Sequence, residues 1–204
     1  MITIHGRPNS INVQKVVWIA DEVGVAFERL DVGGAFGGND TAEYLAMNPT
    51  GRIPTIQDGD LALWESNAIV RYLAATYGSA TWWPDGSAQW AANQWMDFAH
   101  TMIGQLTTVF IGMVRTAPED RDDAKIEKAR QEVNRLWTIV ETALNRRPYL
   151  TGSTISAGDV PLGCAVYRWY GLDIERPDLP GVAAWYERLK SRKPFADHVM
   201  LPLT

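Results

Sequence analysis

The sequence predicts an α/β domain followed by an all-helical domain, and three observations support this fold class. Up to residue 77, short β-branched segments alternate with helical ones in the order βαβαββα. From Ala88 onward, only helical periodicity is found. The stretch between the two, "YGSATWWPDGS", is rich in Gly, Ser and Pro, which is typical of linkers. We therefore expect domains at residues 1–77 and 88–204, joined by a linker at residues 78–87.

Local signals mark the ends of the elements in the first domain. Gly6 ends the first strand, and Gly24 and Gly78 follow the last apolar residues of two helices. Pro49 stops a third helix. The expected elements are, in order, a strand "ITIH", a helix "NVQKVVWIADEV", a strand "AFERLDV", a short helix "TAEYLAM", a hairpin "TIQDGDLALW" and a helix "SNAIVRYLAATY".

Four helices are expected in the second domain. The first, "AQWAANQWMDFAHTMIGQLTTVFIGMV", is apolar almost all round and is expected to be buried, whereas "DAKIEKARQEVNRLWTIVETALNRR" is amphipathic. The other two are "SAGDVPLGCAVYRWYG" and "PGVAAWYERLKSRK". Ser156 and Asp159 form a capping box at the start of the third helix. Removing either side chain is expected to lower the stability by about 1 kcal/mol.

Composition and charge exclude several classes of partner. The net charge is -5 and no block of Lys and Arg occurs, which speaks against nucleic acid and anionic membranes as main partners. The first residues lack the basic and apolar regions of a signal peptide, and no apolar run approaches the length of a membrane span. We expect a cytoplasmic protein.

Cysteine and histidine usage argues against a disulfide and against a metal site. Cys164 is the only cysteine, so neither an internal disulfide nor a C-x-x-C redox pair can form. His5, His100 and His198 lie far apart in the sequence and show no metal-ligand spacing. No metal is expected, and any thiol chemistry would need a thiol that comes from outside the chain.

The segment "NPTGRIPTI" places Pro54 where a strand begins. Proline lacks the N–H that a sheet needs, so it lies at an edge or in a special turn. If the Ile53–Pro54 bond is cis, the backbone N–H and C=O of Ile53 face outward and can pair with an antiparallel peptide. The alternative is a trans proline on an edge strand.

The segment "WESNAIV" follows shortly after it and begins a helix. Ser66 is a good N-cap, and the amides of the first turn offer partial positive charge to a carboxylate. Glu65 beside it can hold an ammonium group. The two residues could therefore bind both ends of an amino acid zwitterion, while an ordinary helix start would explain Ser66 alone.

In their order and spacing over essentially the whole chain, "ITIHG", "NPTGRIPTI", "LWESNAIVRYL" and "SAGD" resemble the cytosolic glutathione S-transferases. The resemblance implies a thioredoxin-like first domain, a cis bond before Pro54 and a γ-glutamyl site at Glu65 and Ser66. It further implies glutathione as co-substrate and a homodimer. Arg52, next to Ile53, is a candidate for a carboxylate of glutathione, although a solvated surface arginine is the alternative.

The residue that meets the thiol is expected in "RPNSINVQKV", ahead of the first long helix. A hydroxyl donor and a helix N-terminus can lower a thiol pKa from about 8.5 by more than a unit. The resemblance to the bacterial theta-like serine-type classes places Ser10 on the catalytic serine. Asn12 falls where a disulfide-reducing bacterial class carries an asparagine near the sulfur. Either residue could instead serve only as a helix cap.

Candidates for the second-substrate site are weaker. The glycine-rich loop "VGGAFGGND" lacks the spacing of a nucleotide loop, and its Phe36 is expected near the mouth of the site. Asp97 and His100 fall on the helix that would face the site, although packing at the interface is the main alternative for His100. Transfer of glutathione to a hydrophobic electrophile is the leading function. A glutathione-dependent disulfide reductase or peroxidase is the first alternative, and a non-catalytic binding protein with this fold is the second.

Overall fold

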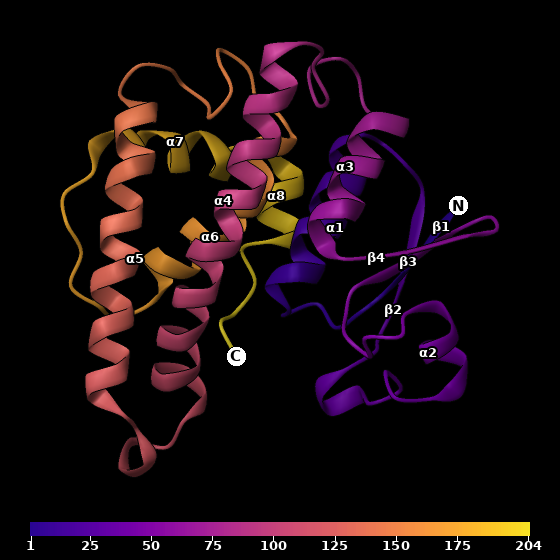
Figure 1. Cartoon of the computed structure of the whole chain (residues 1–204), viewed down its shortest axis with the longest axis horizontal. Coiled ribbons are helices and arrows are strands. Elements are labelled where there is room, and N and C mark those ends of the chain that lie inside the picture. The colour runs from indigo at the N-terminus through magenta and orange to yellow at the C-terminus, as the bar shows by residue number, and fades with distance from the viewer.

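The computed structural model describes all 204 residues, arranged as a small sheet with helices and a larger helical bundle (Figure 1). The first part contains β1 (Ile2–His5), α1 (Ile11–Glu22), β2 (Phe27–Leu30), α2 (Ala42–Met47), β3 (Thr55–Asp58), β4 (Leu61–Trp64) and α3 (Ser66–Thr76). The second contains α4 (Ser87–Phe110), α5 (Asp123–Leu144), α6 (Val160–Gly171), α7 (Pro180–Lys190) and α8 (Lys193–His198). The expected order of elements is confirmed, and α8 is an additional short helix.

The four strands form one mixed sheet in the order β2-β1-β3-β4. β1 runs parallel to β2 and antiparallel to β3, and β3 and β4 form the hairpin. Ile4 lies opposite Ile56 on one face of the sheet, and both are fully buried. On the other face, His5 meets Tyr44 of α2 edge-on at 6.1 Å, because successive side chains of a strand alternate between faces. This is the expected thioredoxin-like domain.

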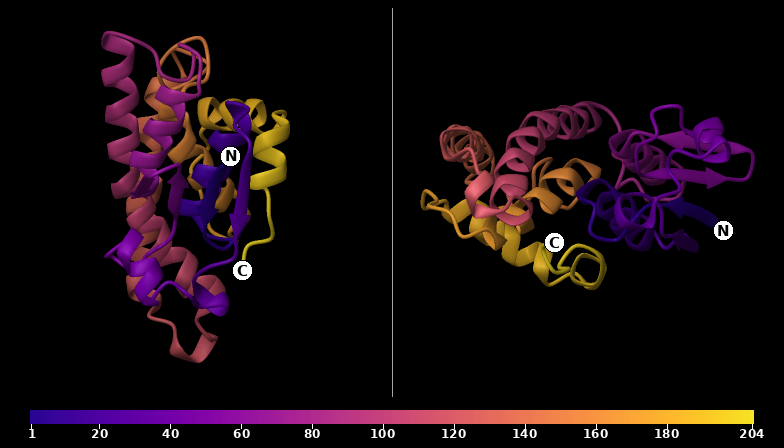
Figure 2. Two further views of the ribbon diagram at one scale, coloured as in Figure 1. Left: turned by 90° about the vertical axis from the view of Figure 1, so that its right-hand side faces the viewer. Right: turned by 90° about the horizontal axis from the view of Figure 1, so that it is seen from below.

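The helix α1 lies between the sheet and the helical bundle (Figures 1 and 2). Trp18 of α1 is completely buried and packs edge-on against Phe195 of α8. A Cβ atom on Gly163 of α6 would lie 2.6 Å from the Trp18 ring, so only glycine allows this approach. The buried apolar residues of both parts therefore form one continuous core.

Two details of the helices differ from expectation. Trp90 is 70% exposed, so the expectation that the first bundle helix is apolar all round is wrong; one face of α4 packs against α5 and α6 and the other faces solvent. The helix ends at Phe110 and continues as a π-helical turn over Ile111–Arg115. The capping box at Ser156 and Asp159 is confirmed, with a short 3-10 turn ahead of α6. No helix is long and apolar enough to span a lipid bilayer.

Candidate functional site

A polar cleft of about 70 Å³ lies where the loop before β3 meets the N-termini of α1 and α3. Several of the residues singled out from the sequence line this one cavity. Its lining residues are Asn12, Asn48, Thr50, Arg52, Ile53, Pro54, Glu65 and Ser66. Ser10 is not among the lining residues, although it immediately precedes α1.

The bond between Ile53 and Pro54 is cis, which confirms the expectation. Neither the N–H nor the C=O of Ile53 makes a hydrogen bond within the chain. Two side chains from the α2 region hold the loop from below, because the Tyr44 hydroxyl and the Asn48 amide each donate to the carbonyl of Arg52 at 2.7 Å. The cleft therefore presents a free backbone donor and acceptor from a loop that is fixed.

The start of α3 differs from the expected cap. Glu65, not Ser66, occupies the N-cap position, and its φ of 68° is the only positive value outside glycine. Such a conformation is costly for a residue with a Cβ, and strained residues of this kind cluster at active sites and ligand-binding sites. Ser66 is the first helical residue, and its hydroxyl donates to Asn12 Oδ1 at 3.2 Å instead of capping the helix. The exposed Glu65 carboxylate and the first amides of α3 thus border the same cleft.

The start of α1 offers two free donors. Ser10 is the N-cap residue by position, and its hydroxyl makes no cap bond and no other hydrogen bond within the chain. Asn12 Oδ1 accepts from Lys15 Nζ at 2.9 Å, and an ammonium group can only donate, so this atom must be the oxygen. The amide nitrogen of Asn12 is left without a partner in the chain. Both side chains are therefore available to a ligand.

Lys15 is a buried cation beneath the cleft. It is 1% exposed, and its Nζ donates to Ser66 Oγ and to Asn67 Oδ1, each at 3.3 Å, as well as to Asn12. Burial lowers the pKa of Lys15 to about 8, with a smaller opposing effect from the charge of Glu65 and a smaller lowering effect from the charge of Arg168. The charge therefore lacks a paired carboxylate, and an anion in the cleft would stabilise it.

The same network reaches the helical bundle. Asn67 donates its amide to the carbonyl of Met96 in α4 at 2.6 Å. The Asn67 amide nitrogen also lies 3.3 Å from His100 Nε2. The floor of the cleft is thus tied to α4 by hydrogen bonds.

Comparison with known proteins identifies the family. Residues 2–75 match the N-terminal domain of glutathione S-transferases, and residues 123–188 match the C-terminal domain. Glutathione S-transferase GstB of Escherichia coli strain K12 is 38% identical over 208 residues, which span all of both chains. The chain belongs to the glutathione S-transferase family. Glutathione S-transferase 3 of Zea mays is 30% identical over 206 residues, covering 95% of this chain and 91% of the maize protein.

Solved structures of the family agree with this membership. A theta class glutathione S-transferase from Xanthomonas axonopodis pv. citri, with glutathione bound, superimposes with a TM-score of 0.96 at 48% identity. The superposition covers 100% of this chain and 99% of the other. The apo form gives a TM-score of 0.88 at 41% identity, covering 100% and 98% of the two chains.

The expected second-substrate residues are not brought together. Phe36 is 56% exposed in the short 3-10 turn Gly34–Phe36. Asp97 forms an ion pair with Arg71 across α3 and α4, and His100 is hydrogen-bonded to Asn67. None of the three lines the cleft. Asp97 and His100 are both exposed, and each has one polar contact with a residue of α3.

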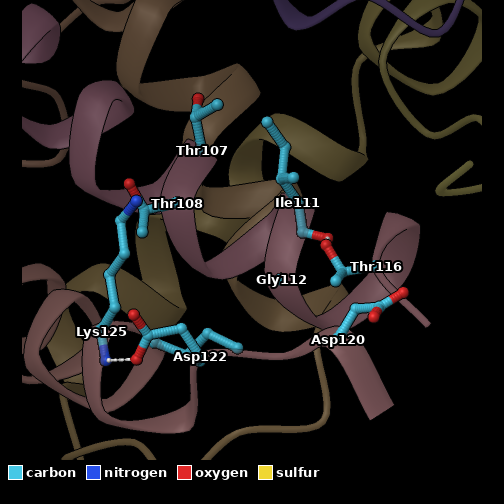
Figure 3. Close-up of a pocket in the computed structure, with 9 residues that line it drawn as sticks. Thr107, Thr108, Ile111, Gly112, Thr116, Asp120, Asp122 and Lys125 are labelled. Carbon is cyan, nitrogen blue, oxygen red and sulfur yellow. Dashed lines mark hydrogen bonds between the residues drawn. The ribbon is translucent and has the colours of Figure 1, made fainter. Parts of the chain in front are cut away.

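A second cavity, of about 300 Å³, lies at the far end of the α4 and α5 pair (Figure 3). Its walls carry Thr107, Thr108 and Ile111 from α4 and the π turn, and Asp122 and Lys125 from the start of α5. The Asp122 carboxylate accepts from the backbone N–H of Lys125 at 3.0 Å, which is an ordinary helix cap. None of the predicted glutathione-site residues lies in it.

Sequence reasoning missed Lys15, Asn67, Tyr44 and Asn48. Lys15 carried a usable signal, because it lies within an otherwise apolar helical stretch and three residues after Asn12. A charged residue on a buried helix face needs partners, and the i, i+3 spacing supplies one of them. Asn67 lies directly beside Ser66 but carried no signal of its own, because its partners lie on other helices.

Proposed function

We propose that the chain binds glutathione in the polar cleft and transfers its thiolate to the electrophilic carbon of a second substrate. In this proposal residues 1–77 hold glutathione and residues 88–204 supply part of the second-substrate site. The supporting observation is that Ile53, with its free backbone pair, lines one cleft together with Glu65 and Ser66. That combination suits a γ-linked tripeptide with an amino acid head.

Each contact has a chemical reason. The Ile53 amide and carbonyl would pair with the backbone of the cysteinyl residue, as an added strand does. Glu65 would receive the ammonium group, and Ser66 with the first amides of α3 would receive the α-carboxylate. Arg52 is exposed at the rim of the cleft and could take the glycine carboxylate.

The reaction needs a thiolate near the start of α1. Hydrogen bonds from the Ser10 hydroxyl or the Asn12 amide, together with the helix dipole, favour the ionised sulfur. The thiol proton leaves to solvent, the sulfur forms a bond to carbon, and the leaving group departs with its electron pair. Ionisation and positioning then account for most of the rate gain.

The pKa of the bound glutathione thiol shows whether Ser10 or Asn12 activates it. The Asn12 side chain lines the cleft, and its amide is free to donate to the sulfur. We therefore expect Asn12→Ala to raise the pKa of the bound glutathione thiol by about one unit, because the thiolate loses a hydrogen-bond donor. Ser10→Ala should raise it by as much if the serine is the activator. Thiolate absorbance measured against pH checks both variants. If neither variant changes the titration, neither side chain activates the thiol.

A glutathione-dependent disulfide reductase or peroxidase is the second candidate. It is favoured by Asn12, whose free amide faces no other partner and whose position matches a disulfide-reducing class. Assays with an aryl halide and with hydroxyethyl disulfide under the same conditions separate the two activities. Retention on immobilised glutathione tests the non-catalytic alternative, which predicts no binding. We also propose a homodimer, which a mass measurement in solution tests.

A further inference from the structure

Three arginines from distant parts of the chain meet around Asn9, the residue before Ser10. Arg7 donates to the side-chain carbonyl of Asn9, and Arg168 Nη2 donates to its backbone carbonyl at 2.8 Å. Arg115, in the π turn after α4, donates to the main-chain oxygen of Thr204 through Nε at 3.2 Å and also through Nη2. Asn9 contacts the Thr204 hydroxyl, so the three cations share one small polar frame.

An aromatic ring holds two of these charges close together. The guanidinium carbons of Arg115 and Arg168 lie 4.9 Å and 4.4 Å from the centre of the Phe110 ring. The ring attracts both cations through its quadrupole. Arg7 packs against the glycine-rich loop, where a Cβ on Gly34 would lie 2.9 Å from its side chain. The arginine cluster, which we define as Arg7, Arg115 and Arg168, therefore lies between that loop and the end of α4.

No Asp or Glu side chain forms an ion pair with the arginine cluster. Five other arginines form ion pairs with Asp or Glu and six more do not, but only Arg7, Arg115 and Arg168 lie together without such a pair. Arg168 is only 5% exposed, and its Nε has no hydrogen-bond partner. Burial, and then the charge of Arg115, lowers the pKa of Arg168 to about 10. In a chain with a net charge of -5, unpaired cations concentrated at one place favour a bound anion.

We propose that the arginine cluster is an anion-binding subsite for the second substrate, which is therefore an electrophile that carries a carboxylate. This inference rests on the proposed function. Two guanidinium forks suit a carboxylate because they donate pairs of parallel hydrogen bonds. The cluster adjoins Ser10 at the start of α1, where the thiolate is expected, so the bound carboxylate would present the neighbouring carbon to the sulfur.

The carboxylate takes no part in the bond changes. The glutathione sulfur forms a bond to the electrophilic carbon, and the leaving group departs from that carbon with its electron pair. The carboxylate stays ionised and bound throughout, so its role is positioning and selection. A substrate with a neutral amide in the same place would lose the charge-assisted contacts.

Two product analogues that differ only in this group test the subsite. S-(carboxymethyl)glutathione and S-(carbamoylmethyl)glutathione carry a carboxylate and a carboxamide on the same carbon, and calorimetry measures the affinity of each. We expect the wild type to bind the carboxylate conjugate about tenfold more tightly, as charge-assisted hydrogen bonds predict. Arg115→Met keeps an apolar contact with Phe110 and should remove most of this preference without weakening the carboxamide conjugate. Arg7→Met should act in the same direction.

Arg146→Met is the matched control, because Arg146 is exposed and makes no ion pair and no side-chain hydrogen bond. It should keep the wild-type preference. Equal affinity of the wild type for both conjugates would overturn the subsite and leave the proposed function intact. Equal weakening of both conjugates by Arg115→Met and Arg7→Met would also overturn it, since the arginines would then hold the tripeptide itself. Binding of neither conjugate, nor of glutathione, would overturn the proposed function and this inference with it.

Discussion

Lys15 and Asp159 are both buried ionisable residues, at 1% and 0% exposure, but they are satisfied in different ways. The Asp159 carboxylate accepts from the backbone amides of Leu150 and Ser156 at 2.9 and 3.0 Å, and from the indole of Trp185 at 3.0 Å. Lys15 donates only to side-chain oxygens, and two of these, from Asn12 and Ser66, line the cleft.

Burial moves both groups towards their neutral forms. It raises the pKa of Asp159 to about 6 and lowers that of Lys15 to about 8. The Asp159 partners belong to a turn, a helix start and the bundle core, so that carboxylate joins parts of the fold. The Lys15 partners border an open site, so its charge is available to a ligand. Asp159 is therefore expected to contribute mainly to stability, whereas Lys15 is expected to contribute mainly to the binding of an anion.

The largest effect is expected at Asp159. Asp159→Ala removes the acceptor of four buried donors, two of them on Ser156, and should lower the free energy of unfolding by about 3 kcal/mol. This replaces the sequence-based expectation of about 1 kcal/mol, which counted only the helix cap. Urea unfolding measures it, with Asp85→Ala on the exposed linker as control. If Asp159→Ala lowers the free energy of unfolding no more than Ser156→Ala does, the contacts of Asp159 with Leu150 and Trp185 do not contribute to stability.

The pH dependence of stability tests the charge on Lys15. Between pH 8 and 10.5 the folded state has lost the Lys15 proton while the unfolded state keeps it, so the free energy of unfolding rises with pH. From pH 7 to 9.5, the wild type should gain about 2 kcal/mol relative to Lys15→Met. The charges of Glu65 and Arg168 act on Lys15, the buried Cys164 thiol stays neutral in this range, and all three residues are the same in both proteins. The free energy of unfolding is measured in urea at each pH for both proteins. If it depends on pH in the same way in the wild type and in Lys15→Met, Lys15 does not have a lowered pKa.

The smallest of the three effects is on binding. Lys15→Met should weaken glutathione about tenfold at pH 7, because the anion loses a cation beneath the cleft. Stability at that pH should equal or exceed that of the wild type, since a buried charge is removed. Calorimetry and urea unfolding give the two quantities, with Lys128→Met on the exposed face of α5 as control. If stability falls while glutathione affinity is unchanged, Lys15 is structural, as Asp159 is.

Local sequence signals predicted much of the cleft. Pro54 and the cis bond before it, together with the acid at Glu65, were all anticipated, and they line one cavity. The sequence predicted Ser66 as the N-cap of α3, but Glu65 occupies that position. The Ser66 hydroxyl instead forms hydrogen bonds with Asn12 and Lys15. Side-chain partners that lie on another helix cannot be predicted from consecutive residues of the sequence.

The helical half was predicted in outline and less well in detail. Periodicity located α5, α6 and α7, since an apolar stripe must face a core wherever that core lies. It misjudged α4, because the exposure of Trp90 depends on which neighbours cover that face. The candidates Asp97 and His100 lie on the expected helix but are engaged with Arg71 and Asn67.

The order of strands and helices, the capping box and the segments around Pro54 and Glu65 follow from residues near one another in the chain, because propensity, capping and turn geometry act over a few residues. The buried ammonium of Lys15 and the meeting of Arg7, Arg115 and Arg168 depend on folding, since their partners are up to about 160 residues apart. Electrostatic energy depends on distance in space and on burial, and neither can be predicted from residues that are neighbours in the sequence.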